Sequence, residues 1–274
     1  MKLGLIGGKL GHSCSPEIHK RLFSLLSLSN RHEYSLLEMD REHIADELCE
    51  LAKEYGGMNV TISYKLDVIP HLTGLSPEAE RIGAVNTIHV REDGCFGYNT
   101  DYSGFGRSLR HAGIAVDGRQ CTVLGTGGAA RAVVQYLADE GAAQITVVSR
   151  TPQEKPAFSR FAMAAGAALI SYDDLRRQCG GDVLINCTPV GMAPDIHVSP
   201  VAEAVVAAYR AVVDLIYNPR RTLFLQYGEQ HQAVVLNGMY MLVAQAIGSE
   251  EIWLGRKIGN AVMEKLTQEM ESWI

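Results

Sequence analysis

The chain has 274 residues, of which 47% are hydrophobic, so it can bury one large core or two smaller ones. Its formal net charge of -6, with no cluster of lysines and arginines, excludes the usual footprint of a nucleic-acid-binding protein. We therefore expect two domains and a small molecule as the partner.

The cysteines, the first residues and the hydropathy of the chain each predict something about its location in the cell. The six cysteines form no C-x-x-C pair and no metal-like spacing, so we expect reduced thiols in the cytoplasm, without a disulfide or a zinc site. The N-terminus reaches glycine too early for a signal peptide, and we expect mature protein from Met1. Charges interrupt the apolar stretch 201–216, so no membrane span is predicted. The cysteines are Cys14, Cys49, Cys95, Cys121, Cys179 and Cys187.

The first half of the chain has alternating strand and helix patterns. Pro16 suits a first helical turn with Ser15 as its cap, and Gly56-Gly57 is expected to end the second helix. The predicted strands are residues 3–6, 34–37, 58–62 and 85–90, and the predicted helices are residues 16–28 and 41–55.

The pattern changes after a hairpin signal at Glu92-Asp93-Gly94 and an amphipathic stretch at 105–111. Strands and helices then alternate, which predicts a doubly wound sheet, and after Gly238 only helical patterns follow. We predict an α/β protein with two domains that meet near residues 101 and 102, and a helical C-terminal segment, 238–274. Strands of the second domain are predicted at 122–124, 145–148, 183–186, 212–216 and 233–236.

The stretch 121–131 indicates an apolar strand, a glycine turn and a helix, with the fingerprint G-x-G-x-x-A. Gly125 would allow the tight turn, Gly127 would let the backbone approach a pyrophosphate, and Ala130 would keep the helix close to the strand. Such a turn can also be purely structural, and the fingerprint alone leaves both interpretations open.

The chain resembles the shikimate dehydrogenases and their quinate/shikimate dehydrogenase relatives nearly from end to end. The resemblance implies an NADP-dependent enzyme that reduces 3-dehydroshikimate to shikimate reversibly, in aromatic amino-acid biosynthesis, without a metal. It also implies a substrate-binding catalytic domain, 1–101, completed by the helices of 238–274, and a doubly wound dinucleotide-binding domain, 102–237. The motifs that carry it, in order, are 12–16 (HSCSP), 59–65 (NVTISYK), 82–87 (IGAVNT), 97–101 (GYNTD), 125–130 (GTGGAA), 186–192 (NCTPVGM), 214–219 (DLIYNP) and 238–245 (GMYMLVAQ).

Ser13 and Ser15 stand two residues apart, so their hydroxyls would point the same way if the link between them were extended. Two hydroxyls can bind a carboxylate without adding charge. The resemblance implies that this pair holds the substrate carboxylate. The alternative is a helix cap with a solvated neighbour.

Lys65 and Asp101 are by default a solvated lysine and a helix cap. If the two lie together, the carboxylate keeps the ammonium charged and oriented, and the unit can exchange a proton with an alcohol oxygen. The resemblance implies that they form this catalytic pair.

Four uncharged side chains can both donate and accept hydrogen bonds to ring hydroxyls. The resemblance places them against the substrate, whereas singly they could be a turn residue, a core aromatic or exposed positions. Asp214 could be a buried strand-end carboxylate with backbone partners. The four residues are Thr61, Asn86, Tyr217 and Gln245.

Cofactor preference depends on the second strand of the nucleotide domain, which ends in Ser149-Arg150-Thr151. No acid is present for ribose hydroxyls, and Arg150 offers a planar fork of donors to a 2′-phosphate, so we expect NADP, with NAD as an alternative. Family members often have a further basic residue where Glu154 stands, and Lys155 could substitute for it. The expected cofactor site comprises Gly125, Thr126, Gly127, Gly128, Ala129, Ser149, Arg150, Thr151, Thr188, Met192, Ile216 and Gly238.

Three residues depart from the family pattern. Lys9 and Ser63 replace prolines, which frees the backbone and adds an amide donor, and Tyr240 replaces a small residue and could narrow the pocket. The finer substrate preference therefore stays open. The alternatives are a quinate/shikimate dehydrogenase that uses NAD or both cofactors, and a non-catalytic NADP-binding sensor. The formation of a homodimer is also left open by the sequence.

Overall fold

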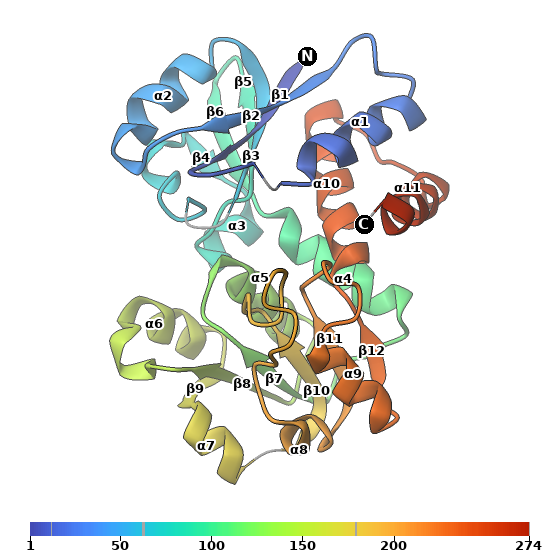
Figure 1. Cartoon of the computed structure of the whole chain (residues 1–274). Coiled ribbons are helices and arrows are strands. Elements are labelled where there is room, and N and C mark those ends of the chain that lie inside the picture. Colours follow the sequence, from blue (N-terminus) through green and yellow to red (C-terminus); the bar gives the residue numbers. More distant parts are fainter. Residues whose placement is uncertain (12, 62–63, 179, 274) are drawn as a thin grey trace. The chain divides into compact units, whose positions relative to one another are not determined.

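The computed structural model describes residues 1–11, 13–61, 64–178 and 180–273, and these form two compact units (Figure 1). The first comprises Met1–Gly104 with Val243–Trp273, and the second comprises Phe105–Leu242. The units divide inside helices α4 (Thr100–His111) and α10 (Met239–Leu254), a few residues beyond the expected boundaries. Predictions that involve His12, Ile62, Ser63, Cys179 or Ile274 lie outside the described residues.

The first unit is built on a mixed sheet with the strand order β2-β1-β3-β5-β6-β4. Strand β1 pairs in parallel with β2 and β3, whereas β5 is antiparallel to β3 and β6. The predicted hairpin is confirmed, since Arg91 pairs with Gly94. The strands are β1 (Lys2–Gly7), β2 (Glu33–Glu38), β3 (Tyr55–Val60), β4 (Gly74–Leu75), β5 (Thr87–Arg91) and β6 (Gly94–Tyr98).

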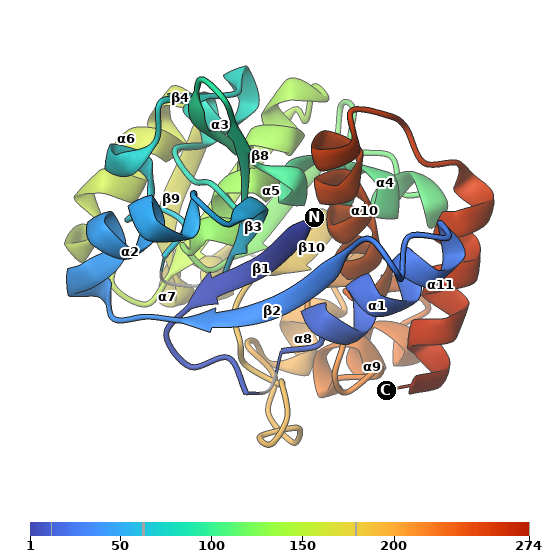
Figure 2. The same ribbon diagram turned by 90° about the horizontal axis from the view of Figure 1, so that it is seen from above.

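Helices from both ends of the chain cover this unit. Helix α11 runs beside α1, far from it in sequence (Figure 2), and Trp253 of α10 donates from Nε1 to the carbonyl of Ile88 at 2.9 Å. The C-terminal helices therefore complete the first unit. The helices are α1 (Ser15–Leu25), α2 (Ile44–Leu51), α3 (Pro77–Ile82), α10 and α11 (Asn260–Trp273), with 3-10 turns η1 (Arg41–His43) and η2 (Ile69–His71).

Two local predictions in this unit are wrong. Gly56-Gly57 does not end the second helix, because α2 ends at Leu51 and both glycines lie in β3. A Cβ on Gly57 would lie 2.2 Å from Nε1 of Trp253, so glycine is required there for packing. Ser15 is not the cap of α1: the N-cap is Cys14, and Ser15 already lies in the helix.

The second unit is a doubly wound parallel sheet, as predicted. Its strand order, β12-β11-β10-β7-β8-β9, is that of dinucleotide-binding domains. One face packs on α7, α8 and α9 through buried side chains such as Leu175, Val205 and Phe224. The sequence analysis missed β9. The strands are β7 (Gln120–Leu124), β8 (Gln144–Ser149), β9 (Ala167–Ser171), β10 (Gly181–Asn186), β11 (Tyr209–Asp214) and β12 (Val234–Leu236), and the helices are α5 (Gly128–Asp139), η3 (Pro152–Glu154), α6 (Pro156–Ala164), α7 (Tyr172–Arg177), α8 (Glu203–Val206) and α9 (Leu223–Gln230).

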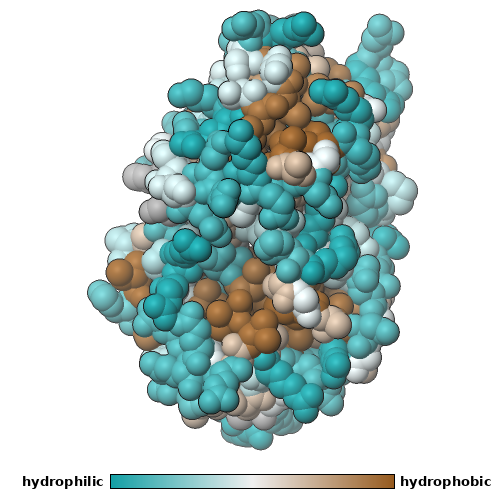
Figure 3. Space-filling view, turned by 90° about the vertical axis from the view of Figure 1, so that its right-hand side faces the viewer, coloured by the Kyte–Doolittle hydropathy of each residue, from teal (hydrophilic) through white to brown (hydrophobic). Residues whose placement is uncertain are grey.

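The surface is mixed in character. Hydrophilic residues predominate on the face drawn in Figure 3, and hydrophobic residues gather in separate areas among them. None of the helices that the structure describes has the length and apolar character needed to cross a membrane.

Candidate active site

Lys65 and Asp101 form an ion pair in the first unit. The ammonium of Lys65 donates to Oδ2 of Asp101 at 2.5 Å, and the two side chains are only 13% and 9% exposed. Asp101 lies in the first turn of α4. An ammonium has three N–H donors, so the bond to Asp101 orients the group and leaves donors for another oxygen. The structure thus brings the expected acid/base residues together.

Asn86 holds the other oxygen of this carboxylate. Its Nδ2 donates to Oδ1 of Asp101 at 2.9 Å and to Oγ1 of Thr100 at 3.0 Å. Its Oδ1 accepts from the backbone N–H of Thr100 at 2.7 Å. Sequence reasoning expected Asn86 to bind a ring hydroxyl and missed its contact with Asp101. The position of Asn86 directly before β5 gives no sequence signal for that contact.

The serine pair differs from the expectation. Cys14 between the serines has a helical backbone, with φ -80° and ψ -7°, so the link is not extended and strand alternation does not align the hydroxyls. Instead, Oγ of Ser13 accepts from the backbone N–H of Ser15 at 3.2 Å. Burial raises the pKa of Tyr34 well above its usual range, and a side-chain hydrogen bond with Ser15 opposes this shift.

The remaining expected substrate residues are divided between the units. Thr61 directly follows β3, and its backbone N–H donates to the carbonyl of Ile6 at 3.1 Å. Gln245 lies in α10, in the part that belongs to the first unit. Tyr217 follows β11 and belongs to the second unit. Five of the six expected substrate residues and both expected catalytic residues thus lie in the first unit.

The glycine turn of the second unit fits a pyrophosphate. Gly125 has φ +106°, and a Cβ there would lie 3.0 Å from Thr188. A Cβ on Gly127 would meet nothing within 4 Å, so the space beside this residue is open. Gly127 is the N-cap of α5, so its position supplies no side-chain hydrogen bond to the first amides of the helix. Amides at a helix N-terminus attract anions. Ala130 is fully buried against the sheet. These residues suit the backbone of a dinucleotide.

Two neighbouring strand ends complete this edge of the sheet. Thr188 donates from its backbone N–H and from Oγ1 to Oδ1 of Asn186, at 3.0 and 2.6 Å. The backbone N–H of Gly238 donates to the carbonyl of Ile216 at 3.0 Å, and a Cβ on Gly238 would lie 2.0 Å from the oxygen of Leu215. Glycine is therefore required at 238 by packing. Met192 is 44% exposed.

Asp214 is a buried structural carboxylate, in agreement with the simpler interpretation of its sequence position. Its oxygens accept from Asn186, Thr222 and the backbone N–H of Ile216 at 3.0, 2.7 and 3.1 Å. Burial raises the pKa of Asp214 to about 6, although these three hydrogen bonds act in the opposite direction. Its position allows it to hold the ends of β10 and β11 together.

A positively charged residue, Arg150, directly follows β8. Arg150 is exposed directly after the strand, while Ser149 is buried and accepts from the backbone N–H of Thr151 at 3.4 Å. Burial raises the pKa of Tyr172, and the charge of Arg150 acts in the opposite direction.

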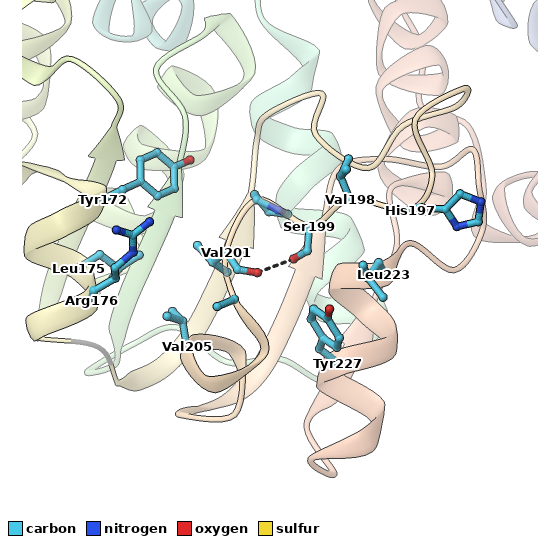
Figure 4. A pocket seen from close by; sticks show the side chains of 12 residues that line it. Tyr172, Leu175, Arg176, His197, Val198, Ser199, Val201, Val205, Leu223 and Tyr227 are labelled. Atoms are coloured by element: carbon cyan, nitrogen blue, oxygen red, sulfur yellow. Dashed lines mark hydrogen bonds between the residues drawn. The ribbon is translucent and has the colours of Figure 1, made fainter.

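Tyr172 also borders a cavity of about 430 Å³ in the second unit. Figure 4 shows Tyr172 and Arg176 on one side of this cavity and Tyr227 on the other, whereas the ring of His197 points away from it. The residues that line it include none of the expected cofactor residues. The cavity therefore shares no lining residue with the expected cofactor site.

The departures from the family pattern have different consequences. Tyr240 stacks on His111, with ring centroids 4.1 Å apart and an interplanar angle of 15°, and Lys9 is exposed. The ring of Tyr240 is thus engaged by a partner inside the second unit. Ser63 lies outside the described residues.

Comparisons with known proteins agree over the whole chain. Residues 5–88 match the family model "Shikimate dehydrogenase substrate binding domain". A shikimate dehydrogenase (NADP(+)) of Clostridium beijerinckii is 42% identical over 98% of this chain and 96% of its own. The crystal structure of a chorismate mutase/shikimate 5-dehydrogenase fusion protein from Clostridium acetobutylicum is 43% identical, covers 100% of this chain and 98% of that chain, and has a TM-score of 0.93. A Thermus thermophilus shikimate 5-dehydrogenase, solved with NADP(H) and shikimate, is 31% identical, covers 98% of this chain and 99% of its own, and has a TM-score of 0.86.

Proposed function

The chain belongs to the shikimate dehydrogenase family, and from this premise we propose that it reduces 3-dehydroshikimate to shikimate reversibly with NADPH, with Lys65 and Asp101 as its acid/base pair. The observation that carries the proposal is the ion pair of 2.5 Å between these two residues, with Asn86 on the second carboxylate oxygen. It supplies a fixed ammonium in a largely buried site.

Lys65 acts on the reacting oxygen. NADPH, when bound, supplies the hydride that adds to the ring ketone carbon. As negative charge develops on the ketone oxygen, Lys65 donates a hydrogen bond to it and then transfers a proton, which completes the alcohol. In the oxidative direction Lys65 takes the hydroxyl proton. Asp101 keeps the ammonium oriented and stabilises its charge.

The polar residues of the first unit would bind the rest of the substrate. Ser13 and Ser15 would hold the carboxylate through their hydroxyls. Thr61, Asn86 and Gln245 would form hydrogen bonds with the ring hydroxyls. Neutral groups suit this task because each can donate and accept.

The second unit would bind NADP at the carboxyl edge of its sheet. Open space beside Gly127 and the uncapped start of α5 support pyrophosphate binding there. The exposed guanidinium of Arg150, without an acid beside it, supports a 2′-phosphate contact and hence NADP over NAD. We also propose a cytoplasmic location, on the basis of the cysteine pattern.

The experiment is a turnover assay of the purified protein with shikimate and with quinate, each with NADP⁺ and with NAD⁺, followed by absorbance at 340 nm. We expect the highest kcat/KM for shikimate with NADP⁺. Preferred oxidation of quinate with NAD⁺ would overturn the proposed substrate and cofactor. Binding of NADPH without turnover of either alcohol would instead favour a non-catalytic sensor.

A further inference from the structure

We propose that Thr87 and Ser249 are positioning residues for the acid/base pair, acting through the carboxamide of Asn86. This inference rests on the proposed function, because it concerns the orientation of Asp101 toward Lys65. Thr87 opens β5, and Ser249 lies in α10, far along the chain. Both side chains are fully buried.

The two hydroxyls lie at the centre of a buried polar cluster. Their oxygens are 2.8 Å apart, and Oγ1 of Thr87 donates to Oδ1 of Asn86 at 3.0 Å. Nδ2 of Asn59 donates to both hydroxyl oxygens, at 3.2 Å to Thr87 and 2.8 Å to Ser249. Each hydroxyl is thus in contact with an amide donor and with the other hydroxyl.

The number of available protons decides which group donates in each hydrogen bond of the cluster. A hydroxyl has one proton to donate, and Asn59 supplies N–H donors to both oxygens. The one proton of Ser249 has two acceptors within reach, the carbonyl of Gln245 at 3.1 Å and Oγ1 of Thr87 at 2.8 Å, so the proton of Thr87 is available for Oδ1 of Asn86. That donor supports the orientation in which Nδ2 of Asn86 faces Asp101. A carboxylate held on both oxygens presents Lys65 in one geometry.

Helix α10 can reach this cluster because Gly248 is small. A Cβ on Gly248 would lie 3.2 Å from Cβ of Thr100, so glycine lets α10 lie close to the first turn of α4. Ser249, the next residue, then reaches Oγ1 of Thr100 at 3.4 Å. The same hydroxyl donates to the carbonyl of Gln245 at 3.1 Å, one turn earlier. The C-terminal helix is thereby tied to the turn that carries Asp101.

Asn59, at the other end of the cluster, is held in place by Tyr34. Tyr34 donates from its hydroxyl to Oδ1 of Asn59 at 2.8 Å, and its ring stacks on His19 with centroids 4.0 Å apart. Hydrogen bonds thus form a path from Tyr34 through Asn59 to the hydroxyls of Thr87 and Ser249. Every residue of this path lies in the first unit.

The decisive variant is Thr87→Val, which removes the hydroxyl and keeps the shape of the side chain. We expect kcat for shikimate oxidation to fall about three- to tenfold with KM changed less than about twofold, because the interaction lost matters in the transition state. The deuterium isotope effect at the reacting carbinol carbon should rise, since hydride and proton transfer become slower. Thr87→Ser, which restores the hydroxyl, should recover kcat to within about twofold.

A double variant and a control variant distinguish a positioning role from an effect on stability alone. In the Thr87→Val background, Ser249→Ala should cost much less kcat than it does in the wild type, because Ser249 acts through Thr87. Thr122→Val is the matched control: Thr122 is a buried strand threonine of the second unit that accepts from the hydroxyl of Tyr209 at 3.0 Å. It should lower stability and leave kcat unchanged.

The outcomes are distinguishable from those of the proposed function. Wild-type kcat and isotope effect in Thr87→Val, with an active wild type, would overturn the positioning role and leave the proposed function standing. Additive effects of Thr87→Val and Ser249→Ala would also overturn it. If Thr87→Val does not fold, Ser249→Ala alone carries the test with the same expected loss of kcat. A wild type without shikimate turnover would contradict both proposals.

Discussion

Nδ2 of Asn86 donates to Oδ1 of Asp101 at 2.9 Å, on the opposite side of the carboxylate from Lys65. A carboxylate held at both oxygens has little freedom to rotate, so the ammonium of Lys65 is oriented before any substrate binds. Such preorganisation lowers the cost of reaching the transition state. Asn86 therefore holds one carboxylate oxygen of the proposed acid/base pair, in addition to its proposed contact with the substrate.

The space beside Gly127 gives a prediction about the cofactor. Gly127→Val should abolish NADP binding, because the new side chain would fill the open space next to the start of α5. The free energy of unfolding should change by less than about 1 kcal/mol, since no atom lies within contact distance. Gly259→Val, at another glycine with open surroundings, is the control and should bind NADP normally. Normal NADP affinity in Gly127→Val, measured by fluorescence titration, would contradict the proposed site.

Arg150 should determine the preference between the cofactors. Arg150→Gln should raise KM for NADP⁺ about tenfold or more and leave KM for NAD⁺ nearly unchanged, because only NADP⁺ has the 2′-phosphate that the guanidinium can bind. Arg177→Gln is a matched control at an exposed arginine of the same unit. Steady-state kinetics with both nucleotides decide the question. Equal changes in KM for the two nucleotides would rule out a 2′-phosphate contact.

Asp214 should make stability depend on pH. Its pKa is about 6 in the folded protein and about 4 when unfolded. Between these values the folded chain binds the proton and the unfolded chain does not, so this contribution to stability falls as pH rises from about 4 to 6 and is level above that. Asp214→Asn should remove this dependence.

The measurement is urea unfolding followed by circular dichroism at several pH values. The difference in unfolding free energy between wild type and Asp214→Asn should decrease by on the order of 2 kcal/mol between pH 4 and pH 6.5. A difference that stays constant over this range would show that Asp214 does not titrate there.

Gly57 should be intolerant of a side chain. Gly57→Ala places a methyl group 2.2 Å from Nε1 of Trp253, which must displace the indole and its bond to Ile88. We expect a loss of about 2–4 kcal/mol from overpacking and the broken hydrogen bond. Tryptophan fluorescence during urea unfolding measures it. Gly259→Ala should change stability by less than about 0.5 kcal/mol, and equal midpoints for the two variants would refute the packing argument.

The sequence predicted the second unit better than the first. Its strands alternate with helices in local patterns, and the parallel order follows from the connection rules of such folds. In the first unit, Gly56-Gly57 looked like a helix end because its reason, Trp253, lies far along the chain. Ser15 looked like a cap because the helical backbone of Cys14 leaves no local sequence signal.

The candidate site was predictable only in part for the same reason. Family motifs identified Lys65 and Asp101, and the structure joins them at 2.5 Å. The cluster formed by Asn59, Thr87 and Ser249 was not foreseen, because it depends on contacts between β3, β5 and α10. Residue spacing cannot reveal which polar side chains meet across such distances in sequence.

The most direct test of the account is the kcat of Lys65→Ala for shikimate oxidation with NADP⁺, measured beside the dissociation constant for shikimate. Lys65 is proposed to move the proton and to stabilise the charged oxygen, so kcat should fall by about a hundredfold or more while the dissociation constant changes by less than about threefold. Near-normal turnover in this variant would contradict the acid/base role of Lys65.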